Sequence, residues 1–490
     1  MSAAPSTAAV LAVFTQLFSP RWFAPWQEPT PPPPRPRSRR RRKGKKPPAP
    51  PRRRGFYERI FSLRVTLWYL LFQRLSFDGT LASVVTDLRA GGADRLGRRR
   101  GPKLSRQVRS TKTGAYNQAR QRLPLELLQA ALAELAAMLS RLVGDAPAPA
   151  RAPAPDRRRR QLLDGSTLEM LPTASLAAAF PQARNQHGVS DWCVMRILVG
   201  FCAKSGAVLS ACCGPVSYSE QAMAWSLLEC GTKFTVWIGD RNFGVWSVVA
   251  QARRYHQDVV VRLTKVRARR LYRGQPMVSG EDRPIDWRPT RHDQSPAGLV
   301  RDAVSGRLIY VRLTKAGCTI DLWLFTTLPA GEYPVALLVQ WYGQRWQAEL
   351  HFRSVKTQLQ MTELDVRSPQ MARKEFYAGL LAYSLVRAVM WAAGERLEQG
   401  IKAISFSQAR RVVLSRLAEW GRRDRSGAGT ASRWVRLLVA EVSRQTLPKR
   451  RRERPSEIRR VRHRQQKFPS FRGSRAAARA RDLATKSLWN

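Results

Sequence analysis

The order of strand-like and helix-like segments between residues 161 and 263 restricts the fold more than any other feature of the sequence. Three strand-like segments come first, namely Gln161–Met170, which surrounds Asp164 and Gly165, and the apolar runs Trp192–Cys202 and Ala207–Cys213. Lys204–Gly206 (KSG) joins the last two runs and is typical of a hairpin turn. Strand and helix patterns then alternate at Ser219–Glu229 (helix), Phe234–Ile238 (strand), Phe243–Arg254 (helix) and Asp258–Leu263 (strand). This order predicts an α/β fold in which a mixed sheet carries helices on both faces.

The segments on either side of this predicted sheet differ from it in pattern. Before it, residues 56–145 show the helical spacing of apolar side chains and include Thr113–Leu123 (TGAYNQARQRL). Arg120 and Arg122 in that stretch have two interpretations, contact with DNA or simple solvation. After the sheet, residues 264–330 contain strand-like runs with polar breaks, which predict a β-rich insertion.

Composition supplies the remaining boundaries. Pro-rich and Arg/Lys-rich stretches near both ends bury too little apolar surface to order themselves, and an Ala/Pro alternation is typical of an extended linker. We therefore expect six segments, namely a disordered basic arm (1–55), a helical DNA-binding domain (56–145), a linker (146–158), a mixed-sheet domain with the β insertion (159–362), a helical region (363–445) and a disordered basic tail (446–490).

The charge balance indicates the kind of partner. The 490-residue chain carries 86 Lys and Arg residues against 35 Asp and Glu residues, a formal net charge of +51. This balance argues against an ordinary soluble enzyme of small molecules, and it favours a polyanionic partner, of which nucleic acid is the commonest. The arm and tail should add phosphate affinity without reading sequence.

Cysteine and histidine usage narrows the possible chemistry. The six cysteines include no Cys-x-x-Cys, which favours buried thiols in a reducing compartment over disulfides or zinc. The five histidines are scattered, so carboxylates must carry any metal chemistry. Ala8–Phe14 is apolar but too short to span a bilayer, and no basic residue precedes it as in a signal peptide. We expect a cytoplasmic, nucleoid-associated protein without a membrane partner.

The stretch Trp341–Met361 (WYGQRWQAELHFRSVKTQLQM) places one carboxylate in an otherwise basic and aromatic predicted helix. At about 100° per residue, offsets of three, seven and fourteen keep four side chains on one stripe, those of Tyr342, Arg345, Glu349 and Lys356. Such a face suits a divalent-metal site on a phosphodiester, because the carboxylate holds the metal and the cations neutralise phosphate oxygens. A surface helix with an Arg–Glu pair four residues apart explains the same spacing and is the commoner case.

Two-metal phosphoryl transfer requires further carboxylates that converge from separate elements. Asp240 follows a predicted buried strand, at the end where ligand sites gather, although it could equally cap the next helix. Asp164 lies beside Gly165 and could be a turn residue. Spacing alone leaves three competitors, Glu169, Asp191 and Asp258.

These residues also carry a family resemblance. Tyr342-x2-Arg345-x3-Glu349-x6-Lys356 matches at every position the YREK signature of the IS-four family of DDE transposases. Asp164–Thr167 (DGST) resembles the family's first-aspartate segment, and Ile238–Phe243 (IGDRNF) resembles its second-aspartate segment. Thr113–Leu123 resembles the family's amino-terminal segment. The resemblance covers about residues 56–444 and leaves the arm without a clear counterpart. It implies an RNase H-like fold with a β insertion before the final helix.

The resemblance further implies a role for each residue. Asp164, Asp240 and Glu349 stand where the family's catalytic triad binds two Mg²⁺ ions, for which Mn²⁺ can substitute. One ion activates the attacking water or 3′-hydroxyl, and the other stabilises the leaving oxygen. Tyr342, Arg345 and Lys356 stand where the family contacts phosphate near the scissile bond. Trp323 sits where a family tryptophan stacks on a flipped base, and a packed core residue is its alternative interpretation.

The implied function is cut-and-paste DNA transposition. The chain would bind the terminal inverted repeats of its own insertion sequence, cleave there and join the ends to target DNA, as a homodimer on paired ends. Two other interpretations stay open. One is a metal-dependent nuclease on the same fold that does not join strands, and the other is a noncatalytic basic protein that binds nucleic acid.

Overall fold

The computed structural model describes residues 18–27, 60–97, 101–145, 153–185, 188–315, 318–422 and 428–448, with a few isolated residues near the two ends. Most of the predicted basic arm and tail, and residues 146–152 of the predicted linker, lie outside the described residues. Residues Met1–Leu447 form one compact unit and Pro448–Asn490 a second. The sheet and its covering helices all belong to the first unit.

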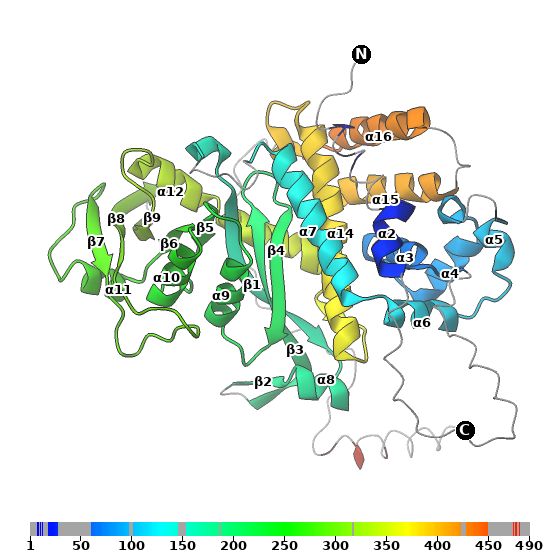
Figure 1. Ribbon diagram of the computed structural model, residues 1–490, viewed down its shortest axis with the longest axis horizontal. Coiled ribbons are helices and arrows are strands. Elements are labelled where there is room, and N and C mark those ends of the chain that lie inside the picture. The colour runs from blue at the N-terminus through cyan, green and yellow to red at the C-terminus, as the bar shows by residue number, and fades with distance from the viewer. Residues whose placement is uncertain are drawn as a thin grey trace, which may run out of the picture. The chain divides into compact units, whose positions relative to one another are not determined.

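The described strands form one mixed sheet of ten strands (Figure 1). Its main path runs β2-β3-β1-β5-β6-β9-β8-β7, while β4 pairs with β3 and β10 pairs with β1. The strands are β1 (Arg160–Met170), β2 (Gln182–Asn185), β3 (Gly188–Cys202), β4 (Val208–Pro215), β5 (Val236–Gly239), β6 (Asp258–Arg262), β7 (Asp282–Trp287), β8 (Val304–Lys315), β9 (Cys318–Thr326) and β10 (Glu363–Leu364).

The five strands β4-β3-β1-β5-β6 have the order and directions of an RNase H-like sheet. Strand β3 is antiparallel to both β4 and β1, whereas β5 is parallel to β1 and β6 is parallel to β5. The predicted mixed sheet is therefore confirmed, and β1 lies at its centre. Strand β10 belongs to this sheet although it begins one residue beyond the predicted end of the sheet domain at 362.

Side chains of the central strands alternate between two hydrophobic cores. Leu162 of β1 packs in a core with α12 (Val335–Gly343), α13 (Trp346–Arg353) and α14 (Pro369–Gly394). Its neighbour Leu163 packs in a second core with α9 (Glu220–Glu229) and α10 (Trp246–Arg254). Because both faces are covered, the short strand β5 is apolar and buried at every position, which is the pattern that identified it.

The predicted hairpin between β3 and β4 is present, and its turn depends on Gly206. This residue has φ +70°, a conformation that favours glycine. A Cβ at Gly206 would also lie 2.4 Å from the imidazole of His351. The turn therefore needs glycine for its backbone and for the close approach of α13.

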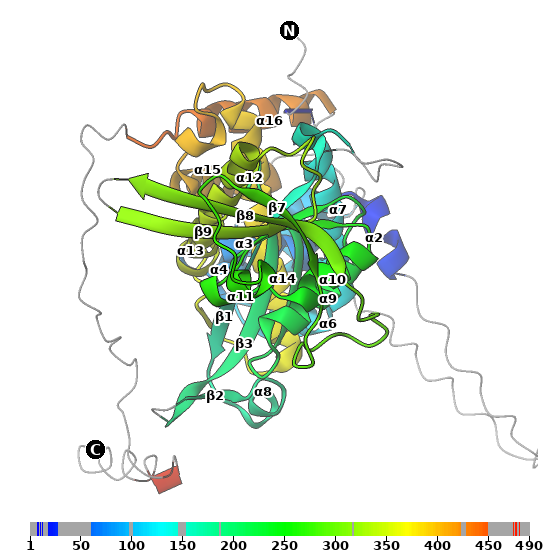
Figure 2. The same cartoon turned by 90° about the vertical axis from the view of Figure 1, so that its left-hand side faces the viewer.

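The predicted β insertion extends the sheet. Strand β9 pairs antiparallel with β6, and β8 and β7 follow it outward. Figure 2 shows β8 and β9 as a long pair of strands, with α11 (Lys265–Leu271) nearby. The insertion thus lengthens the same sheet and shares the second core, to which Trp287 and Phe325 belong.

Helix α14 connects the other helices to the sheet. Of its 26 residues 21 are buried, and it contacts β4, α3, α7, α15 and α16. Figure 1 shows it in yellow between α7 and α15. The predicted amino-terminal helices, sheet and carboxy-terminal helices are therefore layers of one unit. The larger helices of these outer layers are α3 (Leu63–Leu75), α4 (Leu81–Arg89), α6 (Gly114–Arg122), α7 (Leu125–Leu142), α15 (Phe406–Arg422) and α16 (Ala428–Ser443).

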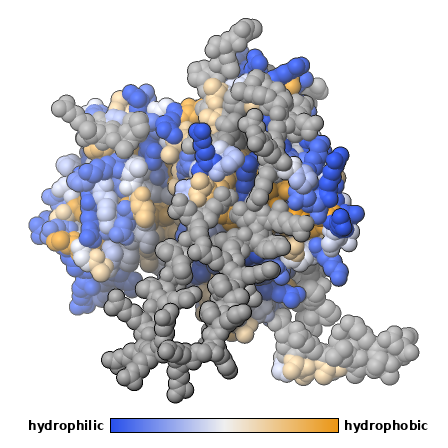
Figure 3. All heavy atoms as spheres, turned by 45° about the vertical axis from the view of Figure 1, so that its right-hand side comes forward, coloured by the Kyte–Doolittle hydropathy of each residue, from blue (hydrophilic) through white to orange (hydrophobic). Residues whose placement is uncertain are grey.

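Helix α14 is also long and apolar enough to cross a membrane by length and composition, as are α6 and α7 if counted as one bent span. In α14, 89% of the most apolar window is buried inside the fold. Figure 3 shows a face of the molecule whose described residues are mainly hydrophilic, with scattered apolar ones. The apolar character of α14 is thus explained by its place in the core.

Arg120 fits neither interpretation made from the sequence. It is buried and forms an ion pair with Glu375 of α14, which also pairs with Arg74 of α3 at 3.1 Å. Arg122, two residues later, is exposed. The amino-terminal motif thus supplies a buried charge that fastens α6 to α14.

Candidate active site

The two aspartates lie side by side at the centre of the sheet. Leu163 of β1 and Gly239 of β5 are register partners on parallel strands, and Asp164 and Asp240 directly follow them. Adjacent strands are about 4.8 Å apart, so the two carboxylates leave neighbouring backbone positions. Asp164 is within the long strand β1 and is therefore not a turn residue.

Asp240 ends its strand in a short turn. Its Oδ1 accepts a hydrogen bond from the backbone N–H of Asn242 at 2.9 Å. Helix α10 begins only at Trp246, with Val245 as its N-cap residue. The alternative that Asp240 caps this helix is therefore wrong, and its second carboxylate oxygen has no hydrogen bond from a described residue.

The predicted single helix over Trp341–Met361 is wrong, because the chain divides it into three pieces. Helix α12 ends at Gly343, a poor helix former, and α13 begins at Trp346. Hydrogen bonds across the break have the tight 3₁₀ spacing, as from the N–H of Arg345 to the carbonyl of Tyr342 at 2.9 Å. A wide π-helical turn, η3 (Ser354–Gln358), follows α13. The four signature residues therefore come from three consecutive pieces.

These pieces still direct the signature residues toward the aspartates. Arg345 donates a hydrogen bond from Nη2 to Oε1 of Glu349 at 2.8 Å and also interacts electrostatically with Asp164. Lys356 in η3 donates from Nζ to Oγ of Ser166 at 3.2 Å. Ser166 lies two residues beyond Asp164, hence on the same face of β1.

Tyr342 lies beside the second aspartate. Burial raises the pKa of Tyr342, Asp240 adds to this effect, and Arg345 and Arg262 oppose it. Arg262 is the last residue of β6 and also forms a hydrogen bond with Tyr342. The phenol of Tyr342 and the guanidinium groups of Arg345 and Arg262 therefore lie near the two aspartates.

Asp164 lies in an environment that disfavours its charged form. Burial raises the pKa of Asp164 to about 6, the charges of Asp240 and Glu220 add to this effect, and Arg345 opposes it. Neither Asp164 nor Asp240 forms an ion pair with a described residue. A bound cation would compensate two neighbouring carboxylates of this kind.

The donor set fits a hard divalent cation in type, because carboxylate oxygens are the ligands that Mg²⁺ and Mn²⁺ take. Glu349 is held away from the aspartates by its ion pair with Arg345, and its side chain is 43% exposed. Accordingly, no group of three or more carboxylate, imidazole or thiol side chains among the described residues is gathered closely enough to hold a metal ion. Glu349 would have to exchange Arg345 for the cation.

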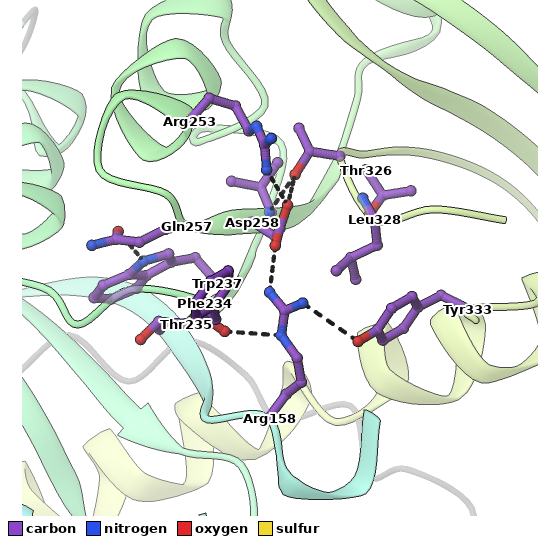
Figure 4. A network of polar contacts seen from close by, with 12 residues as sticks. Arg158, Phe234, Thr235, Trp237, Arg253, Gln257, Asp258, Thr326, Leu328 and Tyr333 are labelled. Atoms are coloured by element: carbon purple, nitrogen blue, oxygen red, sulfur yellow. Dashed lines mark hydrogen bonds and ion pairs between the residues drawn. The ribbon is translucent and has the colours of Figure 1, made fainter. Parts of the chain in front are cut away.

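The three competing carboxylates lie elsewhere. Asp258 is buried at the start of β6, where it pairs with Arg158 and, at 2.7 Å, with Arg253 (Figure 4). Because β5 and β6 are parallel, this position is at the opposite end of the strands from Asp240. The Asp258 network joins the segment just before β1, the start of β6 and the end of α10 as a structural cluster.

The other two competitors are separated from Asp164 along the strands. Asp191 is exposed on β3, eight residues before Val199, the register partner of Asp164, which is about 26 Å at 3.3 Å per residue. Glu169 lies five residues beyond Asp164 on β1, so its side chain points to the other face.

Trp323 is a packed residue, so the predicted stacking on a flipped base is not supported. Its side chain is 7% exposed, and its ring lies between those of Tyr310, at 4.2 Å, and Tyr272, at 5.4 Å. Both faces of the indole are therefore occupied. The sequence could not separate the two interpretations because the aromatic partners come from β8 and the segment after α11.

Two polar residues at the site were missed in the sequence. Glu220 lies at the first position of α9, where an acidic residue is ordinary, so its pattern carried no signal. Asn242 lies within the quoted IGDRNF segment but was not singled out. Its Nδ2 donates a hydrogen bond to Oε2 of Glu220 at 2.7 Å.

Comparison with known proteins agrees with this geometry. Residues 155–385 match the family model described as a transposase DDE domain. The chain is 25% identical over 264 residues to the transposase InsG of insertion sequence element IS4 from Escherichia coli strain K12, an alignment covering 52% of this chain and 58% of that protein. It is also 36% identical over 81 residues to the transposase of insertion sequence element IS421 from Escherichia coli, covering 16% and 21%.

A structural comparison matches a cryo-EM structure of the piggyBac transposase synaptic complex with hairpin DNA, at a TM-score of 0.37 and 9% identity, over 77% of this chain and 76% of that one. The chain spans little more than half the length of the IS4 relative. The match to the DDE domain contains all three candidate carboxylates and the whole signature segment. Residues 155–385 therefore match a transposase DDE domain, and the chain is similar to the IS4 transposase over about half of its length.

Proposed function

We propose that this protein is a DNA transposase that binds the terminal inverted repeats of its own insertion sequence, cleaves the DNA there and joins the freed 3′-hydroxyls to target DNA. The observation that carries the proposal is the register of β1 and β5, which sets Asp164, within β1, beside Asp240, directly after the end of β5. Arg345 interacts electrostatically with Asp164 and holds Glu349 in an ion pair. The match of residues 155–385 to a transposase DDE domain supports this reaction class.

In this proposal Asp164, Asp240 and Glu349 hold two Mg²⁺ ions, and Mn²⁺ can replace them. Such ions supply activation of the attacking oxygen and stabilisation of the leaving oxygen. The chain's own cations receive the phosphate. Arg345 is released from Glu349 when that carboxylate turns toward the cations, and its guanidinium then becomes available to a phosphate oxygen.

Lys356 and Tyr342 complete the phosphate contacts on this face. Lys356 is anchored beside Ser166, about 7 Å along β1 from Asp164, within reach of the next phosphate of a strand. Tyr342 stays protonated because burial raises its pKa, so its hydroxyl can donate a hydrogen bond to a phosphate oxygen. We further propose that a homodimer holds the two DNA ends and that the protein acts on the nucleoid in the cytoplasm.

The test uses full-length protein, Mg²⁺ and duplex DNA carrying the inverted repeats that flank the gene. Asp164→Asn and Glu349→Gln should each lower strand cleavage at least about 100-fold while leaving DNA binding unchanged. The matched control is Asp191→Asn, which removes an exposed carboxylate from β3 and should cleave like the parent.

The products separate the proposal from its alternatives. Nicked and joined strands support transposition, whereas nicks without joined products identify a nuclease on the same fold. Full activity of Asp164→Asn and Glu349→Gln would leave a noncatalytic DNA-binding protein.

A further inference from the structure

A cavity of about 510 Å³ lies between the amino-terminal helices and the start of α14. Residues of α3, α6 and α14 line it, together with the loop before α4, β10 and the loop after β10. Its lining includes exposed residues, such as Gln121 and Arg367, and buried ones, such as Arg120, Leu364 and Glu375. The cavity therefore opens to solvent and reaches into the core, and its volume is in the range of ligand sites.

The cavity lies on the face of the sheet that carries Asp164. Leu364, which lines it, is the register partner of Met170 in β1. Met170 is six residues beyond Asp164, so both side chains point to the same face, about 20 Å apart at about 3.3 Å per residue. Ser166, to which Lys356 donates a hydrogen bond, lies between them. A DNA strand that passes the aspartates and Lys356 would reach the cavity within a few nucleotides.

The charges of the lining favour an anion. Three arginines (Arg74, Arg120 and Arg367) and two acidic residues (Asp365 and Glu375) line the cavity, which leaves a net charge of +1. Glu375 pairs with both Arg74 and Arg120, so one carboxylate faces two guanidinium groups. The side chain of Arg120 is only 10% exposed, and its buried Nε has no hydrogen-bond partner among the described residues. An anion in the cavity would compensate this buried excess of positive charge.

The start of α14 adds to this positive potential. Ser368, the N-cap residue, and Met371 in the first turn both line the cavity. The helix is 26 residues long, and its first turn contains no acidic residue. The positive end of the helix dipole is therefore not neutralised locally, and such a helix start attracts phosphate oxygens.

We propose that this cavity binds a backbone phosphate of the DNA end that is cut, through Arg367, Asn117 and the start of α14. This inference rests on the proposed function and deepens it, because it adds a DNA contact about 20 Å from the candidate active site. Arg120 stays bonded to Glu375 and acts through its charge. The amino-terminal helices thus take part in holding the DNA end beside the aspartates.

The experiment is phosphate-ethylation interference with the full-length protein and duplex DNA carrying the inverted repeats that flank the gene. The parent should show a phosphate, a few nucleotides from the cleavage point, whose ethylation prevents binding. Arg367→Gln should lose this interference, keep the others and lower the slope of log affinity against log salt by about 0.9. The matched control is Arg396→Gln, which removes an exposed guanidinium beyond the other end of α14 and should keep the parent's pattern and slope.

A second variant changes the cavity without removing a cation. Asn117→Asp keeps the size of a half-buried lining side chain and places a carboxylate there, so it should repel the same phosphate and lose the same interference. Thermal unfolding without DNA checks that both variants are folded. If folded Arg367→Gln and Asn117→Asp keep the parent's interference pattern, the inference is overturned.

The outcomes also separate this inference from the proposed function. If Arg367→Gln loses the contact but the parent cleaves no DNA, the proposed function fails and the cavity contact stands. If the parent cleaves and both variants keep every contact, only the cavity contact fails. Stabilisation of the parent against heat by sodium phosphate, without a lost DNA contact in either variant, would assign the cavity to free phosphate and overturn the inference.

Discussion

Glu375 shows how single residues hold this molecule together. Its side chain is 2% exposed on α14, between Arg74 of α3 and Arg120 of α6. Burial acts to raise the pKa of this carboxyl, but Arg74 and Arg120 outweigh it and hold the pKa of Glu375 below its ordinary value. One carboxylate therefore joins two amino-terminal helices to the core helix.

Glu375→Gln should lower the free energy of unfolding by about 3–5 kcal/mol, because it leaves two buried guanidinium groups without a countercharge. Urea unfolding of the full chain measures the change. Glu395→Gln, an exposed residue just after α14, should change it by less than about 0.5 kcal/mol. Equal effects of the two substitutions would show that the buried ion pairs contribute little.

The lowered pKa of Glu375 predicts that the stability difference between the parent and Glu375→Gln depends on pH. Because the pKa of Glu375 is lower in the folded chain than its ordinary 4.5, its contribution is complete above pH 4.5 and is lost as the pH falls through the folded value. The stability difference between the parent and Glu375→Gln should therefore shrink as the pH is lowered from 7 to 3. A difference that stays constant over this range contradicts the prediction.

At the scale of elements, the sequence predicted most strands and helices but not the interruptions within them. A buried strand such as β5 is apolar on both faces, and this pattern is local. The π turn around Lys356 depends on distant partners, since Met361 packs against Gly379 of α14 and Gln358 accepts from Arg410 of α15.

In the candidate site, too, the features that follow from local sequence could be predicted, and those that depend on distant partners could not. Asp240 was placed correctly because it follows an apolar strand directly, and the register with β1 then brings Asp164 to it. Glu220 and the packing of Trp323 could not be found, because a residue's neighbours across a sheet are not encoded by its spacing. For the same reason Arg120 could not be assigned, since its partner lies 255 residues away.

Arg410 of α15 supports the π turn that carries Lys356. Its side chain is fully buried, Nη1 donates to the carbonyl of Gln358, and the guanidinium lies 3.6 Å from the ring centre of Phe77. A carboxy-terminal helix and an amino-terminal loop therefore meet behind the signature segment. This arrangement makes the π turn an element whose shape depends on both ends of the chain.

Arg410→Met should keep the packing of the side-chain stem but leave the Gln358 carbonyl without its donor, at a cost of about 1–3 kcal/mol in stability. Loss of the π turn would displace Lys356, so cleavage of end DNA should fall at least about tenfold. The control is Arg411→Met, which removes the exposed neighbouring guanidinium, 5.1 Å from Phe77. Equal cleavage by both variants would show that Arg410 does not support the position of Lys356.

At the scale of the whole molecule, the formal charge of +51 should dominate affinity for bulk DNA. We expect binding to weaken steeply with salt, by about 10³-fold or more between 50 and 200 mM. Replacing residues 39–54 and 449–481 by Gly/Ser chains of equal length should flatten this dependence. Fluorescence anisotropy with unrelated duplex DNA measures both slopes, and a flat response of the parent would contradict the prediction.

The burial of α14 limits where the chain can be divided without loss of the fold. The DDE match stops at residue 385, inside this helix, which continues to Gly394. A polypeptide that ended at residue 385 would lack α15 and α16. The apolar side chains of α14 that these helices cover would then be exposed, and we expect such a polypeptide to aggregate. The helices after residue 385 are therefore part of the same folding unit as the matched domain, because α15 and α16 pack on α14.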